Sequence, residues 1–225
     1  MTGTGIYALQ HTTRSQGAKM STAADGPSRV KAWLAALSLL AAVGAATVYS
    51  NRLILTMFPD RPYPRDLLFE LLPYVGWTRY LTVIALVAGF SLFLYYALRY
   101  EPRRIPAFTA VFALMYLFRA AMIVLTPLGS AQGEGAFVFD VQQFGMFPSG
   151  HMAASLILVL LTSAEHAPTL RHMQILLAMA QLAGLTLAHG HYSIDIVGGA
   201  LLAYFVVHVW AEGRLFDPIK QLTGA

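Results

Sequence analysis

The sequence predicts an all-α integral membrane protein, an integral membrane bundle of six transmembrane helices. Hydrophobic residues make up 57% of the 225 residues and charged residues only 12%, whereas about a quarter of an average soluble domain is charged. Apolar runs recur along the chain after about residue 30, and most approach the ~20 residues that a membrane-spanning helix needs. Most of the chain is therefore expected to face lipid or its own helices rather than water.

Six apolar windows are expected to form the spans, and the fourth window is the shortest. The windows cover residues 32–50, 79–98, 107–126, 151–165, 173–190 and 195–211. Between the first two lies a stretch with Pro59, Pro62, Pro64 and Pro73, and prolines interrupt helices. This stretch is predicted to be an interfacial loop that can carry a short surface helix.

The chain is expected to divide into three parts. Residues 1–30 are rich in Gly, Ser, Thr and Ala and are predicted to be a mobile cytoplasmic tail. Residues 31–213 are the six-span membrane catalytic domain, and residues 214–225 are a short cytoplasmic C-terminal tail. The first apolar run begins near Trp33, later than a usual signal peptide allows, so this run is expected to remain as a span.

Basic residues predict that both termini are cytoplasmic. The inner segments would hold ten of them: Arg14, Lys19, Arg29, Lys31, Arg99, Arg103, Arg104, Arg171, Arg214 and Lys220. The outer segments would hold four: Arg52, Arg61, Arg65 and Arg79. Because these residues are scattered at the ends of apolar segments, anionic lipid head groups explain them better than nucleic acid does. Short loops favour a prokaryotic inner membrane, although a Golgi or plasma membrane fits the same hydropathy.

Polar side chains near the membrane core indicate where the site lies, because each costs about 2.5 to 3.5 kcal/mol at the centre of a span. Arg119 falls within the third span, while His151 opens the fourth. His191 closes the fifth span and Asp195 opens the sixth. In the predicted topology the two histidines and the aspartate all lie toward the outer face, so one shared site is expected.

The stretch FPSGHM predicts an anion-binding helix start. Ser149 precedes an apolar helix and is a natural N-cap, and the first turn, with Gly150, presents free backbone amides. His151 would lie in this turn, where its ring can donate a proton to a bound phosphate. The competing interpretation is a plain loop-to-helix boundary with His151 as an interfacial residue.

The stretch HGHYSID predicts an oriented histidine. His191 and Asp195 are four residues apart, so a helix would stack them on one face. A carboxylate bonded to one ring nitrogen makes the other more basic, as a nucleophilic or general-base histidine requires. Two alternatives remain: an ion pair that only fastens helices, and a metal site that adds His151 and His189. His189 is expected to face elsewhere, and the absence of cysteine excludes thiolate chemistry.

FPSGHM followed some forty residues later by HYSID resembles the two histidine motifs of the type 2 phosphatidic acid phosphatase superfamily. The chain is most similar to the sphingomyelin synthase branch, through Arg103 and Arg104, MYLFRAAMIVLTPLG around Tyr116 and Arg119, and YPRDLLFELLP. The similarity covers roughly residues 60–212. It implies a transferase without metal or cofactor that moves a phosphorylated head group from a phospholipid donor to ceramide or a related lipid alcohol.

The resemblance also implies roles for individual residues. His191 would attack phosphorus with the aid of Asp195, and His151 would protonate the departing lipid oxygen. From the residues themselves, Ser149 and Gly150 at the capped helix start and Arg119 in the third span are expected to bind the substrate phosphate. An equal alternative for Arg119 is an ion pair inside the bundle, with Asp140 or Glu134 as its partner.

Two departures from the family patterns leave other functions open. Leu185 stands where the phosphatases carry an arginine, and Gly145 stands where the synthases carry an aspartate. A lipid phosphate phosphatase or phospholipase C-like hydrolase would use the same three residues with water as the acceptor. A transporter or non-catalytic membrane protein is the alternative from a different class.

Overall fold

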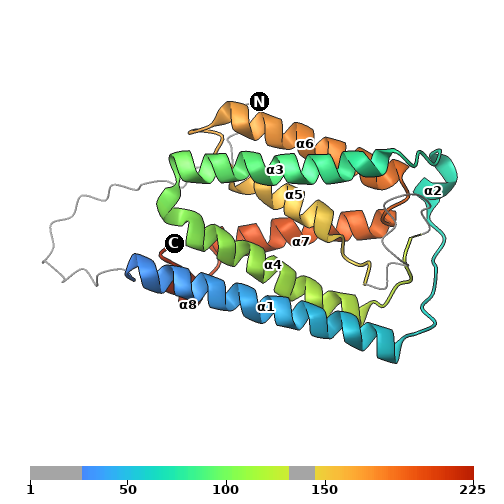
Figure 1. The fold of residues 1–225 in the computed structure, drawn as a ribbon, viewed down its shortest axis with the longest axis horizontal. Coiled ribbons are helices and arrows are strands. Elements are labelled where there is room, and N and C mark those ends of the chain that lie inside the picture. Colours follow the sequence, from blue (N-terminus) through green and yellow to red (C-terminus); the bar gives the residue numbers. More distant parts are fainter. Residues whose placement is uncertain (1–26, 132–144) are drawn as a thin grey trace, which may run out of the picture.

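The computed structural model of the protein describes residues 27–131 and 145–225. Most of the predicted tail therefore lies outside the described residues, as do Asp140 and Glu134. Within them, the regular structure is entirely helical (Figure 1), which confirms the all-α prediction. The elements are α1 (Arg29–Met57), α2 (Leu67–Leu71), α3 (Thr78–Tyr100), η1 (Pro102–Arg104), α4 (Ile105–Leu125), α5 (Gly150–Leu161), α6 (Pro168–Leu187), α7 (Ser193–Glu212) and α8 (Asp217–Thr223).

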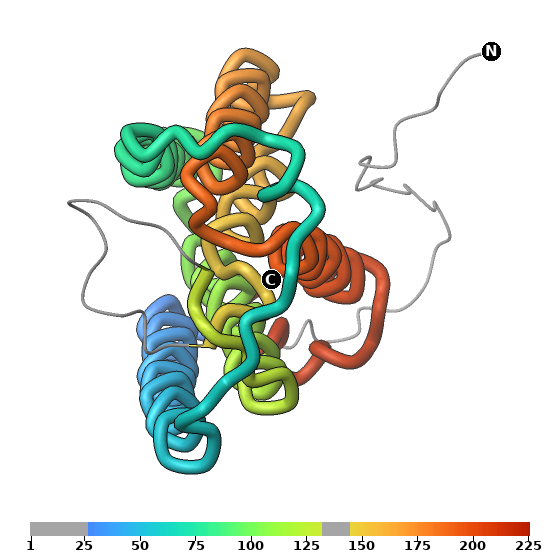
Figure 2. The backbone as a smooth tube through the Cα atoms, turned by 90° about the vertical axis from the view of Figure 1, so that its right-hand side faces the viewer, coloured from blue at the N-terminus to red at the C-terminus, as the bar shows by residue number. Residues whose placement is uncertain are grey.

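The long helices α1 and α3 to α7 run side by side as a bundle, and α5 lies in its middle (Figures 1 and 2). Helix α1 packs mainly on α4, and α3 packs mainly on α6. Helix α5 contacts α3, α4, α6 and α7. The helix whose first turn carries the FPSGHM motif is therefore covered by its neighbours on most sides.

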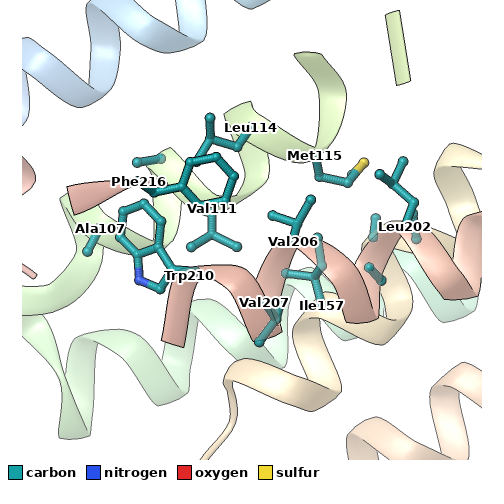
Figure 3. Close-up of a cluster of buried hydrophobic side chains, with 14 residues drawn as sticks. Ala107, Val111, Leu114, Met115, Ile157, Leu202, Val206, Val207, Trp210 and Phe216 are labelled. Carbon is teal, nitrogen blue, oxygen red and sulfur yellow. The ribbon is translucent and has the colours of Figure 1, made fainter. Parts of the chain in front are cut away.

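A buried apolar cluster joins α4, α5 and α7 (Figure 3). Met115, Ile157 and Val206 are fully buried in it, and the small residues Ala153 and Ala203 let the helices approach closely. Burial of such side chains contributes about 1.5 to 3 kcal/mol each in water, while close packing is the main contribution within lipid. This cluster fixes the three helices relative to one another below the site.

Large apolar side chains cover the outer faces of α1 and α3. Exposed examples are Leu34, Leu37, Leu40, Val48, Val83, Ile84, Val87 and Leu94. A contiguous exposed apolar surface of this kind marks contact with a membrane or partner, and here it runs along helices long enough to cross a bilayer. Both helices are therefore lipid-facing.

The number of spans is the part of the fold prediction that is not confirmed. Among the described residues, four segments are long and apolar enough to cross a membrane: α1, α3, η1 with α4, and α7. Helix α5 has 12 residues, which is about 18 Å at 1.5 Å per residue against a hydrocarbon core of about 30 Å. Helix α6 has 20 residues but does not qualify, and its polar Arg171, Gln174 and Gln181 lower its hydropathy.

The boundaries of α1 differ from the predicted window at both ends. The helix begins at Arg29 because the Ser28 hydroxyl caps it by accepting from the Lys31 amide at 3.4 Å, so the last residues of the predicted tail are helical. It continues to Met57 through Asn51 and Arg52, which end the apolar window without ending the helix. The predicted short surface helix between the first two spans is confirmed as α2, which Asp66 caps.

Candidate active site

The predicted site residues gather at the end of the bundle where α5 and α7 begin. Ser149 is fully buried and is the N-cap of α5, where its hydroxyl accepts from the Met152 amide at 3.3 Å. This confirms the predicted cap. The first amides of a helix have no intrahelical acceptor, so the start of α5 carries partial positive charge beside His151.

The starts of α5 and α7 touch through their backbones. The Ser149 amide donates to the Asp195 carbonyl at 2.9 Å. Two glycines of α7 make the approach possible: a Cβ on Gly199 would overlap the Ser149 carbonyl oxygen, and one on Gly198 would lie 2.6 Å from the Phe147 ring. The start of α5 and the aspartate are thus held together by direct backbone contact.

His191 and Asp195 form a buried pair at the start of α7. His191 Nδ1 lies 3.3 Å from Asp195 Oδ2, and the two residues are 7% and 0% exposed. The same carboxylate oxygen accepts from the Tyr192 amide at 3.2 Å. An ionised carboxylate only accepts hydrogen bonds, so Nδ1 of His191 is the donor in this pair.

His151, from the FPSGHM motif, lies beside His191, from the HYSID motif. The ring centroids of His151 and His191 are 5.7 Å apart with the planes at 62°. His151 is exposed whereas His191 is buried. One histidine is therefore oriented by a carboxylate, and the histidine beside it is exposed.

Arg119 reaches the same end of the bundle from α4. Its Nε donates to the Pro148 carbonyl at 2.9 Å, and its Nη2 donates to the Gly145 carbonyl at 3.0 Å. The side chain also lies against Gly150, where a Cβ would be 3.1 Å from Nε. Arg119 therefore anchors the segment that leads into α5. These two hydrogen bonds use two of the five N–H donors of its guanidinium.

Packing leaves no room for a side chain at Gly145, the position where the synthases carry an aspartate. A Cβ at this position would lie 2.5 Å from the Ile123 Cβ and 2.9 Å from the Ile54 Cδ1. The Gly145 amide also faces Asn51, whose Oδ1 is 3.4 Å away. A side chain here would force α1 and α4 apart.

Asp66 belongs to this end of the bundle but was not predicted from the sequence. Its Oδ2 accepts from the Ser193 amide at 2.6 Å and from the Ser193 hydroxyl at 2.8 Å, across 127 residues of chain. Its Oδ1 caps α2 through the Leu68 amide at 2.9 Å. An aspartate before an apolar helical run is a recognisable cap, but no local pattern indicates the bond to Ser193.

His189 lies apart from the His191–Asp195 pair, against aromatic rings. Its ring stacks on Phe69 with the centroids 4.3 Å apart and meets Tyr74 edge-on at 5.4 Å. Its backbone adopts a positive φ of 48°, which directs the chain out of α6. Within residues 27–131 and 145–225, no three His, Asp or Glu side chains form a group that could hold a metal ion.

Tyr192 closes the site toward the loop after α4. Its hydroxyl donates to the Ser130 carbonyl at 3.4 Å. Burial, together with the nearby Asp195, Tyr63 and Asp66, raises the pKa of Tyr192 to about 12. The hydroxyl therefore stays protonated at neutral pH and acts as a donor.

A comparison with protein families now identifies the chain. The model of the family AtPDCT1/2 matches residues 79–212, more than half of the chain, and this range contains His151, His191 and Asp195. No curated protein shows significant similarity. The predicted membership of the sphingomyelin synthase-like branch of the type 2 phosphatidic acid phosphatase superfamily is wrong, because the matched family is one of phosphatidylcholine:diacylglycerol cholinephosphotransferases. The short histidine motifs indicate phosphoryl-transfer chemistry and leave the lipid acceptor open. The chain belongs to the AtPDCT1/2 family.

Proposed function

We propose that the protein moves phosphocholine from phosphatidylcholine to diacylglycerol through a covalent intermediate on His191. The family supports transfer of a phosphorylated lipid head group. The observation that carries the mechanism is the pairing of His191 Nδ1 with Asp195 Oδ2 at 3.3 Å beside the exposed ring of His151.

In the first step, His191 Nε2 attacks the phosphorus of phosphatidylcholine. An N–P bond forms as the bond from phosphorus to the glycerol oxygen breaks. The negative charge of the bound phosphate favours the protonated form of His151, which gives its proton to the departing oxygen, so that the oxygen leaves as the hydroxyl of diacylglycerol. Asp195 stabilises the positive charge that His191 acquires, as an orienting carboxylate does for a catalytic histidine.

In the second step, the hydroxyl of a second diacylglycerol attacks the phosphohistidine. Neutral His151 accepts the hydroxyl proton while the new O–P bond forms and the N–P bond breaks. His191 and His151 return to their starting protonation states, and a new phosphatidylcholine leaves. Because the leaving group and the acceptor are both diacylglycerols, one site serves both half-reactions.

The start of α5 suits the phosphate in both steps. The free amides after Ser149 and the dipole of α5 favour negative charge. Arg119 donates two hydrogen bonds to the Pro148 and Gly145 carbonyls. Because its guanidinium also lies against Gly150, it adds positive charge at the start of α5. Such preorganised donors stabilise the charge that develops on transferred phosphoryl oxygens.

An exchange assay tests the proposal. The purified protein in nanodiscs receives phosphatidylcholine with deuterated choline and a diacylglycerol with distinguishable acyl chains. Label on the new acyl species is expected for wild type and is expected to fall at least about a hundredfold for His191→Ala. His208→Ala is the matched control, because His208 lies on α7 at a distance from the site and pairs with Glu212.

The product pattern separates the proposed transferase from its alternatives. Release of free phosphocholine without acceptor would replace the transferase with a hydrolase. Label that does not move in wild type, or that moves equally in His191→Ala, would contradict the proposal. Ceramide in place of diacylglycerol is expected to accept little label.

A further inference from the structure

The segment that precedes α3 crosses the end of the bundle that carries the site (Figure 2). It holds the loop with His191 from several sides. The Val75 amide donates to the Leu187 carbonyl at 2.8 Å, and Phe69 of α2 stacks on both His189 and Tyr192. The residues on either side of His191 are therefore fixed by α2 and the chain after it.

Asp66 makes the polar contact between this segment and α7. The residue is only 7% exposed, and burying a carboxylate is costly unless hydrogen bonds compensate. Three donors compensate it: the Leu68 amide on Oδ1, and the amide and hydroxyl of Ser193 on Oδ2. Capping α2 needs only the first of these, so the bonds to Ser193 require another explanation.

We infer that Asp66 is a positioning residue that holds His191 in its attacking orientation through Ser193. This inference rests on the proposed function of His191. Ser193 is the first residue of α7, two residues from both His191 and Asp195. By fixing the amide and the side chain of Ser193, Asp66 fixes the helix start from which Asp195 binds the His191 ring.

Two features argue against a direct chemical role for Asp66. Its two oxygens already accept three hydrogen bonds from protein groups, and the residue is only 7% exposed, so a substrate has little access to it. No contact joins it to the His191 ring, which is bonded to Asp195 instead. A displacement of about 1 Å at a reacting group can lower the rate on the order of a hundredfold. Asp66 can therefore control turnover by fixing the position of His191, without touching the His191 ring.

Asp66→Asn is the sharpest variant, because the amide keeps the shape and one acceptor but replaces the other with donors. In the variant the side-chain oxygen can still accept from the Leu68 amide and cap α2. The new NH₂ group then faces the Ser193 amide, and because both groups are donors, this hydrogen bond is lost. We expect kcat to fall on the order of tenfold with KM for both lipids within about twofold, since substrate contacts remain. Glu70→Gln is the matched control: it removes a carboxylate from the same short helix, where Glu70 makes only an exposed ion pair with Arg65.

A double variant tests whether Asp66 acts on kcat through Ser193. Ser193→Ala removes the hydroxyl bond and keeps the amide, so a smaller fall in kcat is expected. The double variant with Asp66→Asn is expected to be no worse than Asp66→Asn alone, because both changes break the same contact. Effects on kcat that multiply would overturn the inference.

A readout that does not depend on turnover completes the experiment. Carbethoxylation of each histidine by diethylpyrocarbonate is followed by peptide mass spectrometry in folded, monodisperse protein. Asp66→Asn is expected to raise the rate at buried His191 severalfold and leave exposed His166 unchanged, while Glu70→Gln changes neither rate. Unchanged reactivity of His191 with unchanged kcat would refute the positioning role. If its reactivity changes while His191→Ala still transfers head groups, the positioning stands and the proposed function of His191 fails.

Discussion

The side chains of the candidate site differ in how far the sequence alone predicts them. The side-chain hydrogen bonds of Ser149 to the Met152 amide and of Asp195 to His191 span three and four residues, so capping and close spacing predict them. The bond from the Ser149 amide to the Asp195 carbonyl joins distant segments and was not predicted. The bonds of Arg119 to the Gly145 and Pro148 carbonyls span 26 and 29 residues and follow from tertiary packing. The sequence therefore indicated that Arg119 belongs to the site and did not indicate its contacts.

Replacement of Arg119 tests its anchoring role. Arg119→Ala removes two hydrogen bonds from a charged donor, and each contributes about 1.5 to 3 kcal/mol. Thermal unfolding in detergent is expected at a clearly lower temperature, and transfer activity should fall with it. Arg52→Ala is the control, since Arg52 is exposed at the end of α1. A variant as stable as wild type with a raised KM for phosphatidylcholine would assign Arg119 to phosphate binding alone.

Gly145 offers a second test at the scale of one residue. Gly145→Ala should destabilise the protein, because its Cβ would meet the Ile123 Cβ at 2.5 Å and Ile54 at 2.9 Å. Overpacking of this kind costs typically about 1 to 3 kcal/mol. Gly44→Ala in α1, which has open space around it, is the matched control and should be neutral or stabilising. Equal melting temperatures for the two variants would contradict the packing account.

At the scale of elements, the apolar windows predicted where helices lie but not how long they are. Helix α1 continues past Asn51 because hydrogen bonding along the helix, rather than hydropathy, decides where a helix ends. Helix α5 stops after 12 residues at Thr162, whose hydroxyl bonds the Leu158 carbonyl at 2.7 Å. The short helix α5 is still stable because neighbouring helices cover it. The hydropathy of one segment contains no information about such contacts between helices.

The contact between α5 and α7 can be tested with one methyl group. Gly199→Ala should push α7 away from the Ser149 carbonyl, break the alignment of His151 with His191 and lower transfer on the order of tenfold or more. Gly190→Ala, next to His191 but with its nearest neighbour 3.8 Å from the added Cβ, should retain most activity. Comparable activities in the two variants would show that the close approach is not needed.

At the scale of the whole molecule, composition and the apolar windows predicted an all-helical membrane protein, and the family was the part predicted wrongly. In the proposed function, the two histidines and the aspartate carry out the attack on phosphorus. They do not specify whether ceramide or diacylglycerol supplies the hydroxyl, because that choice depends on surfaces assembled from several helices. The six-span topology with both termini cytoplasmic likewise remains a prediction.

The topology can be tested with single cysteines, because the chain has none of its own. The start of α1 and helix α8 lie at one end of the bundle, and α2 lies at the other (Figure 1). In intact inverted and right-side-out vesicles, a cysteine at exposed Tyr63 should react with an impermeant maleimide only from outside. One at exposed Leu222 should react only from the cytoplasmic side. Labelling of both positions from the same side would contradict the predicted topology.

Trapping the intermediate tests the central claim most directly. Wild-type protein is mixed with phosphatidylcholine in the absence of diacylglycerol, quenched at alkaline pH to preserve phosphohistidine, and analysed by peptide mass spectrometry. We expect a phosphocholine adduct on His191 that disappears when diacylglycerol is added and never forms in His191→Ala. Rapid head-group transfer with no adduct at any time, or an adduct on another histidine, would contradict it.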